Sequence, residues 1–268
     1  MEWRNIYRGM IMGIIELVPG ISSGTFAVLL GIYERLIAAI SGITTRQWKK
    51  HILFLIPLVI GMGISIFSFS HLMDWLLENH AKPTFYFFMG LILGILPFLF
   101  RTSKARTTFK FRHIVLLIVG ILLVNQLQII PSDETIIVER NFTIYMLLFF
   151  SGIIGSAMML LPGISGSFVL VVLGVYHTII SAIKELEILV IFVVGSGIAL
   201  GVLVMSKIID YFFARFRSET FAFVIGLVIG SVFVIFPGWF YTASQFIIYT
   251  GLFVFGIGLA YIFGKIEY

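Results

Sequence analysis

The chain has 268 residues, of which 60% are hydrophobic and only 12% are charged, and its mean hydropathy is +1.10. Soluble proteins carry about 25% charged residues, so this composition excludes a soluble domain and predicts an all-α polytopic membrane protein. The net charge of +5 comes from Lys and Arg residues in short loops, which membrane topology explains without a nucleic-acid partner. The absence of cysteine excludes disulfides, thiol catalysis and thiolate metal sites.

The first apolar segment, residues 6–18, would form a helix of roughly 20 Å, too short for a hydrocarbon layer of about 30 Å. Residues 25–40 are similarly short, and a polar, turn-prone stretch separates the two segments. We therefore predict a re-entrant helix hairpin over residues 6–40, which enters and leaves on one side of the membrane. Three transmembrane spans complete this first half of the chain, residues 1–130: 52–77, 84–100 and 113–130.

The second half, residues 142–268, follows an external linker at residues 131–141 and repeats this arrangement. Its hairpin covers residues 142–183 and is broken at Pro162. Three spans follow it: 188–213, 220–236 and 246–263. Because one hairpin and three spans make an odd number of crossings, the second half must be inverted relative to the first.

Internal similarity supports the repeat. A shift of 143 residues aligns 18–40 with 161–183, and eleven of the 23 aligned positions are identical. A shift of 136 then pairs the later spans. In secondary transporters, an inverted repeat brings two broken helices together near the midplane, with the substrate between them. The alternative is that Pro-Gly merely kinks two packed helices, which does not explain two serine-rich breaks at equivalent positions.

The distribution of Lys and Arg tests this topology. With the N-terminus inside, thirteen of these residues fall in cytoplasmic loops and three in external loops, as the positive-inside rule predicts. If both hairpins crossed the membrane fully, the loop at residues 101–112 and its five positive charges would lie outside. We therefore expect both termini on the cytoplasmic side.

The two hairpin tips have chemistry suited to an oxyanion. Glycines expose backbone amides, serine and threonine add hydroxyls, and the start of each half-helix attracts negative charge. A carboxylate would also fit, whereas a cationic substrate would find only one acid nearby. The predicted binding residues are Gly20, Ser22, Ser23, Gly24 and Thr25 in the first tip, Gly163, Ser165, Gly166 and Ser167 in the second, and Arg35 on a hairpin arm.

Three acidic residues are candidates for proton coupling. Glu16 lies just before the first tip, at a depth where an ionisable side chain indicates function. A salt bridge to Arg8 or Arg35, or a capping role at the tip, is the alternative. Asp74 and Asp210 are equivalent in the repeat, and each follows a serine by one helical turn. They line one vestibule per face or, alternatively, cap helix ends at the interface.

Two motifs connect the chain to a known family: R-G-M-x-M-G-x-x-E-L-V-P-G-I-S-S-G-T from Arg8 to Thr25 and L-P-G-I-S-G-S from Leu161 to Ser167. Over essentially its whole length the chain resembles the PopT-type polyprenyl-phosphate transporters. The resemblance implies that undecaprenyl phosphate, the lipid carrier of cell-wall precursors, is returned from the outer to the inner leaflet of the bacterial cytoplasmic membrane. We expect no enzymatic activity, metal or cofactor. Membrane lipids, protons and a second copy of the chain are further candidate partners.

Two other classes of protein compete with this interpretation. Undecaprenyl-diphosphate phosphatases also resemble the chain in their re-entrant hairpins with serine-rich Pro-Gly tips. Those enzymes carry an arginine within the serine motif and clustered glutamates, whereas residues 22–24 and 165–167 contain no arginine and only Glu16 lies nearby. A small-anion permease is the third class, and competition by soluble phosphate would distinguish it.

Overall fold

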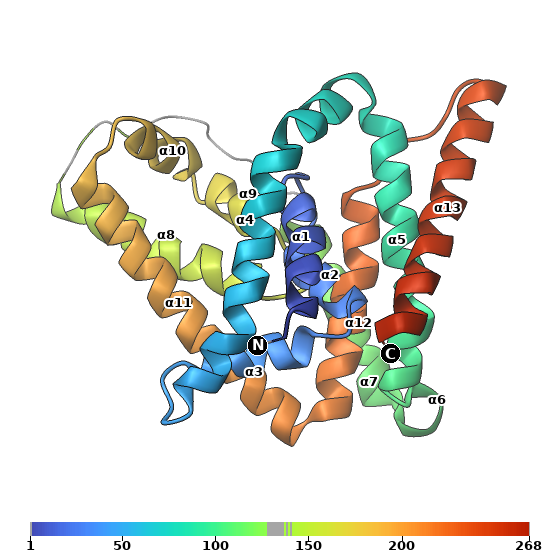
Figure 1. Ribbon diagram of the computed structural model, residues 1–268, viewed down its shortest axis with the longest axis horizontal. Coiled ribbons are helices and arrows are strands. Elements are labelled where there is room, and N and C mark those ends of the chain that lie inside the picture. Colours follow the sequence, from blue (N-terminus) through green and yellow to red (C-terminus); the bar gives the residue numbers. More distant parts are fainter. Residues whose placement is uncertain (1, 128–136, 138, 140, 268) are drawn as a thin grey trace.

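The computed structural model describes residues 2–127, 137, 139 and 141–267, and the regular structure of these residues is helical throughout (Figure 1). The predicted all-α membrane fold is confirmed. In the described part of the chain, six helices are long and apolar enough to cross a membrane. These are α4 (Trp48–Asn79), α5 (Ala81–Thr102), α8 (Phe142–Met159), α11 (Ile188–Arg215), α12 (Arg217–Val234) and α13 (Ala243–Glu267).

Two shorter helices connect α5 to the second half. The single-turn helix α6 (Ala105–Thr108) precedes α7 (Phe111–Leu127), which is apolar but shorter than the six long helices. The end of the predicted span 113–130 and most of the predicted linker 131–141 lie outside the described residues.

Both predicted hairpins contain bent helix pairs. The first runs through α1 (Arg4–Glu16) to its tip and returns through α2 (Ser23–Leu29) and α3 (Tyr33–Gly42), which meet at 120°. The second runs through α8 and returns through α9 (Gly166–Val172) and α10 (Tyr176–Lys184), which meet at 110°. Each return arm, expected as one segment, is therefore divided in two.

The break in each return arm occurs at a glycine in the left-handed region, Gly31 with φ of 63° and Gly174 with φ of 70°. This conformation ends a helix at little cost only when the residue lacks a side chain. The two glycines occupy equivalent positions, so both halves bend at the same place. The bend places α3 at the end of the molecule where both termini lie, and α10 at the opposite end (Figure 1).

The two halves also share their helix crossings. A Cβ atom added to Gly9 would lie 2.1 Å from the carbonyl oxygen of Leu58, where α1 crosses α4. At the equivalent Gly152, it would lie 2.8 Å from the carbonyl oxygen of Val194, where α8 crosses α11. Small residues allow such close backbone approach in membrane helices. The inverted repeat is thus visible in the packing as well as in the sequence.

The remaining long helices pair across the halves. α5 of the first half packs along α13 of the second, and α12 of the second packs along α7 of the first. The equivalent glycines Gly90 and Gly226 make these contacts, because a Cβ atom at either would lie 2.1 Å from a carbonyl oxygen of the partner helix. Each half therefore pairs two of its helices with helices of the other half.

Candidate functional site

The two tips lie against each other. The backbone N–H of Gly163 donates a hydrogen bond of 2.8 Å to the hydroxyl of Thr25, and the Ser22 hydroxyl donates one of 3.4 Å to the carbonyl of Leu161. The space that Gly20 and Gly163 line between the tips has a volume of about 10 Å³. That volume holds roughly one water molecule. In this arrangement a phosphate group does not fit between the tips.

The hydroxyl side chains of the first tip are buried, and those of Ser22 and Thr25 bind backbone groups. Ser22, Ser23 and Thr25 are between 2% and 6% exposed. Ser22 precedes α2 and accepts a hydrogen bond of 3.1 Å from the N–H of Gly24, which caps that helix. In this arrangement Ser22 and Thr25 therefore hold the first tip and the tip contact together.

The second tip is more accessible. Ser165 is half-buried and Ser167 is exposed, whereas Gly166 between them is buried. The two hydroxyls lie 2.9 Å apart and hydrogen-bond to each other. Ser165 occupies the position of Ser22 but does not cap its helix. These two hydroxyls can therefore be offered to a ligand without breaking the contact between the tips.

Glu16 lies beside the first tip, at the end of α1. Its side chain is exposed and accepts a hydrogen bond from Ser23. The alternative salt bridges are not formed, because Arg8 pairs with Glu267 and Arg35 pairs with Glu2 at 2.6 Å. The acid thus contacts a tip residue through a hydroxyl rather than an arginine.

The two repeat-related aspartates have different surroundings. Asp210 on α11 is half-buried and accepts a hydrogen bond of 3.1 Å from Ser41 on α3. Asp74, near the C-terminal end of α4, is exposed. The structure brings neither aspartate into the tip contact.

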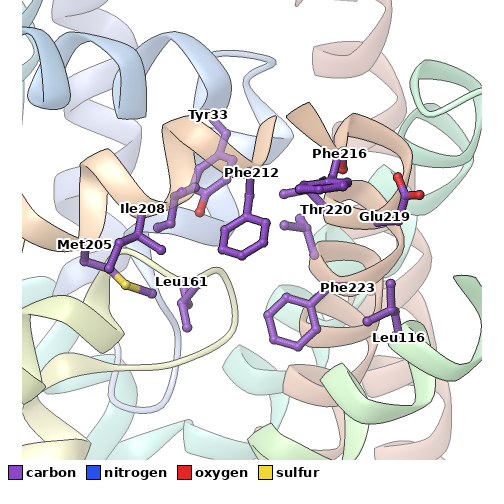
Figure 2. A pocket seen from close by; sticks show the side chains of 12 residues that line it. Tyr33, Leu116, Leu161, Met205, Ile208, Phe212, Phe216, Glu219, Thr220 and Phe223 are labelled. Atoms are coloured by element: carbon purple, nitrogen blue, oxygen red, sulfur yellow. Dashed lines mark hydrogen bonds between the residues drawn. The ribbon is translucent and has the colours of Figure 1, made fainter. Parts of the chain in front are cut away.

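Larger cavities lie away from the tip contact, and two of them share lining residues. The first, here called the lateral groove, is an almost wholly apolar space of about 500 Å³ bordered by α7, α11 and α12 (Figure 2). Figure 2 shows the rings of Phe212 and Phe223 turned toward it. The second, the arginine vestibule, is a polar space of about 390 Å³ that Arg35 and Arg217 line. The predicted binding residue Arg35 lies away from the tips, where it lines both the vestibule and a neighbouring space of about 470 Å³ that Glu2 and Phe54 also line.

Long-range contacts create both cavities, so the sequence alone did not reveal them. Their linings combine residues from both halves, including Tyr33 on α3 and Val224 on α12. Tyr33 donates a hydrogen bond of 2.9 Å from its hydroxyl to the carbonyl of Leu160, just before the second tip. In the sequence, Tyr33 stood out only because the equivalent residue of the second half, Tyr176, is also a tyrosine.

Comparisons with known proteins bear on the same region. A sequence profile of the undecaprenyl phosphate translocase-like family matches residues 12–252, which include both tips. A polyprenyl-phosphate transporter of Staphylococcus aureus is 40% identical over 265 residues, covering 92% of this chain and 93% of that protein. One of Vibrio cholerae is 34% identical over 253 residues, covering 88% and 79%. No solved structure matches significantly. The family resemblance is thus confirmed, and the chain belongs to the undecaprenyl phosphate translocase-like family.

Proposed function

We propose that the chain transports polyprenyl phosphate between the leaflets of a membrane, with the phosphate recognised at the tips and the tail in lipid. The observation that supports this most is the direct contact between two serine-bearing tips from inverted halves, one buried and one accessible. The relatives at 40% and 34% identity are named for the same lipid class.

The transport cycle would exchange the arrangements of the two halves. At present α3 packs against α11 through Ser41 and Asp210, whereas α10 has no comparable contact with α4. In inverted-repeat transporters, exchange of the two arrangements produces the state that opens to the other side. In that second state α10 packs on α4, which brings Lys184, the counterpart of Ser41, to Asp74, the counterpart of Asp210. The two aspartates then hold opposite ends of the molecule closed.

Inward movement of the lipid needs a compensating charge. With the termini cytoplasmic, a phosphate monoester of about −1.5 to −2 charges moves inward against the membrane potential. A potential of 100 mV opposes each charge by about 2.3 kcal/mol, so the total is roughly 3.5 to 4.6 kcal/mol. A proton carried with the lipid lowers this cost, and Glu16 beside Ser23 is the proposed carrier.

Translocation of a fluorescent polyprenyl phosphate in liposomes tests the proposal. The double variant Ser165→Ala/Ser167→Ala removes both accessible hydroxyls and is expected to slow translocation at least tenfold, because hydrogen bonds to charged groups contribute about 1.5–3 kcal/mol each. Thr242→Ala/Ser244→Ala is the matched control, since its hydroxyls lie 3.1 Å apart at the start of α13. Equal rates in the two double variants would contradict phosphate binding at the tips.

The same purified protein distinguishes the competing classes. Incubation with undecaprenyl diphosphate is expected to release no phosphate, and robust turnover would favour the phosphatase instead. Inorganic phosphate is expected to compete poorly with the lipid. Competition as strong as that of the lipid would favour a small-anion permease.

A further inference from the structure

The arginine vestibule opens at the terminal face, defined here as the end of the molecule where both termini lie. The ion pair between Arg8 and Glu267 joins the two ends of the chain there, and Glu267 also lines the vestibule. Arg35 on α3 and Arg217 at the start of α12 contribute guanidinium groups from different halves. Because Glu34 also lines it, the vestibule brings two guanidinium groups and two carboxylates together at one end of the molecule.

Both guanidinium groups are held in position yet remain accessible. Arg35 lies over the ring of Phe54 at 4.9 Å, and Arg217 lies over the ring of Phe221 at 5.5 Å. Their side chains are 56% and 60% exposed, respectively. Stacking on an aromatic ring orients the planar guanidinium group and leaves its N–H donors at the edge of the plane, where they now pair with carboxylates.

The carboxylates that pair with these arginines are exchangeable. Glu2 pairs with Arg35 at 2.6 Å and Glu34 pairs with Arg217 at 2.9 Å, and both carboxylates are more than one-third exposed. Exposed ion pairs of this kind contribute only about 0–1 kcal/mol. A phosphate, which arginine binds through paired N–H donors, can therefore replace a carboxylate at low cost.

The lateral groove adjoins both the vestibule and the second tip. Tyr33 and Val224 line both cavities, and Leu161, which precedes the second Pro-Gly, lines the groove. Ile208, Phe212 and other apolar side chains form most of the remaining wall, which also includes Glu219 and Thr220. Its volume of about 500 Å³ is typical of a ligand pocket. An amphiphile with a charged head and an apolar tail matches the order of these two spaces.

Building on the proposed function, we infer that the vestibule and the groove form a second binding site for the lipid phosphate, at the terminal face and separate from the tips. Arg35 and Arg217 bind the phosphate, and the groove holds the first isoprene units of the tail. Because Leu161 links the groove to the second tip, the lipid passes from the tip to this site with its tail in the groove throughout.

Binding of a photoactivatable short-chain polyprenyl phosphate to the full-length protein in nanodiscs tests the charged part of the site. Arg35→Gln/Arg217→Gln is expected to weaken binding at least tenfold, because two charged hydrogen-bond donors to the phosphate are lost. Arg46→Gln/Arg106→Gln is the matched control, since both arginines are exposed and line neither the vestibule nor the groove. It is expected to bind within about twofold of the unmodified chain.

Mapping of the cross-linked residues separates this site from the tips. A photoreactive group on the first isoprene unit is expected to label the groove at Met205 and Phe223, in the unmodified chain and in the Ser165→Ala/Ser167→Ala variant. Labelling there should fall at least tenfold in Arg35→Gln/Arg217→Gln. Unchanged labelling in that variant would overturn the second site, whereas a chain that neither binds nor translocates the lipid would overturn the proposed function.

Filling the groove tests the apolar part. Ile208→Trp places a large ring at the groove, and Val204→Trp places the same ring one turn earlier on α11, outside it. The two positions are similarly exposed, at 44% and 47%. Cross-linking should fall several-fold only in Ile208→Trp. Equal competition by phosphatidic acid and polyprenyl phosphate would show a general anionic-lipid site and contradict recognition of the tail.

Discussion

The two hairpins begin from nearly the same motif and reach different arrangements. Every residue of α2 is buried, whereas in α9 the serine at its second position, Ser167, is exposed. Tyr33 is 5% exposed, and its counterpart Tyr176 is half-buried. Eleven of 23 aligned residues are identical, so the difference coincides both with the remaining substitutions and with a different partner helix.

The partner of α3 is α11, which belongs to the other half, and α10 lacks the corresponding partner α4. One end of the molecule is thus held together between the halves while the other is not. In the proposed cycle, two inverted copies exchange these arrangements, so the asymmetry corresponds to one of two states. The following predictions test this comparison.

Covalent linkage at either end should have the largest effect. The chain contains no cysteine, so Ser41→Cys/Asp210→Cys and Asp74→Cys/Lys184→Cys introduce unique pairs. A short bifunctional thiol reagent should link the first pair readily and the second only as the other state forms. Either link should abolish translocation in liposomes. Cleavage of a cleavable linker should then restore it. Absence of any link in the second pair during transport would contradict the exchange of states.

The two tip glycines should differ in their effects on stability. At Gly163 a Cβ atom would lie 2.5 Å from the Leu227 carbonyl oxygen, whereas at Gly20 its nearest neighbour is Ile235 at 3.7 Å. Both glycines are left-handed, so alanine costs about 1–2 kcal/mol at Gly20 and roughly 2–4 kcal/mol at Gly163. Apparent melting temperatures in one detergent measure this. A lower melting temperature for Gly20→Ala than for Gly163→Ala would contradict the packing of the second tip.

Glu16 has the apolar counterpart Met159, so proton coupling should depend on the first half. Translocation by Glu16→Gln is expected to lose its dependence on a pH gradient and to slow several-fold when a gradient is present. Rates with and without the gradient measure this, and Glu78→Gln on α4 is an exposed control. Undiminished gradient dependence in Glu16→Gln would remove this residue from the coupling role.

The smallest effect is expected from the two tyrosine hydroxyls. Tyr33→Phe removes the 2.9 Å hydrogen bond to Leu160, so it should lower the free energy needed to detach α3 by about 1 kcal/mol. Tyr176→Phe should change this free energy little. Reaction of a cysteine at Ser41 with a thiol reagent reports the release of α3. If Tyr33→Phe and Tyr176→Phe accelerate this thiol reaction equally, the difference between the halves is contradicted.

Segment lengths and glycine positions allowed much of the fold to be predicted. The span 188–213 begins at the first residue of α11, and the other predicted spans lie within a few residues of helices wherever the structure describes them. Apolar length alone sets these limits, because each buried backbone group in lipid must be satisfied within its own helix. The predicted meeting of the tips agrees with the hydrogen bond between Gly163 and Thr25.

The roles of individual glycines were less predictable. Gly31 and Gly174 lie in apolar runs as Gly90 and Gly226 do, but they provide the left-handed turns of the return arms, whereas Gly90 and Gly226 allow close helix packing. Nothing in a single sequence distinguishes a glycine needed for its φ angle from one needed for its lack of volume. The bend in each arm was missed for this reason.

The sequence by itself determined a membrane protein of two inverted halves, each with a serine-bearing break, because apolar length and repeated motifs are local properties. Only the tertiary structure decided that α5 and α12 pair across the halves, that one tip is buried while the other is accessible, and that two arginines border a groove. Those features depend on which helix surfaces meet over separations of more than a hundred residues. Steric fit between such surfaces is a property of the folded molecule.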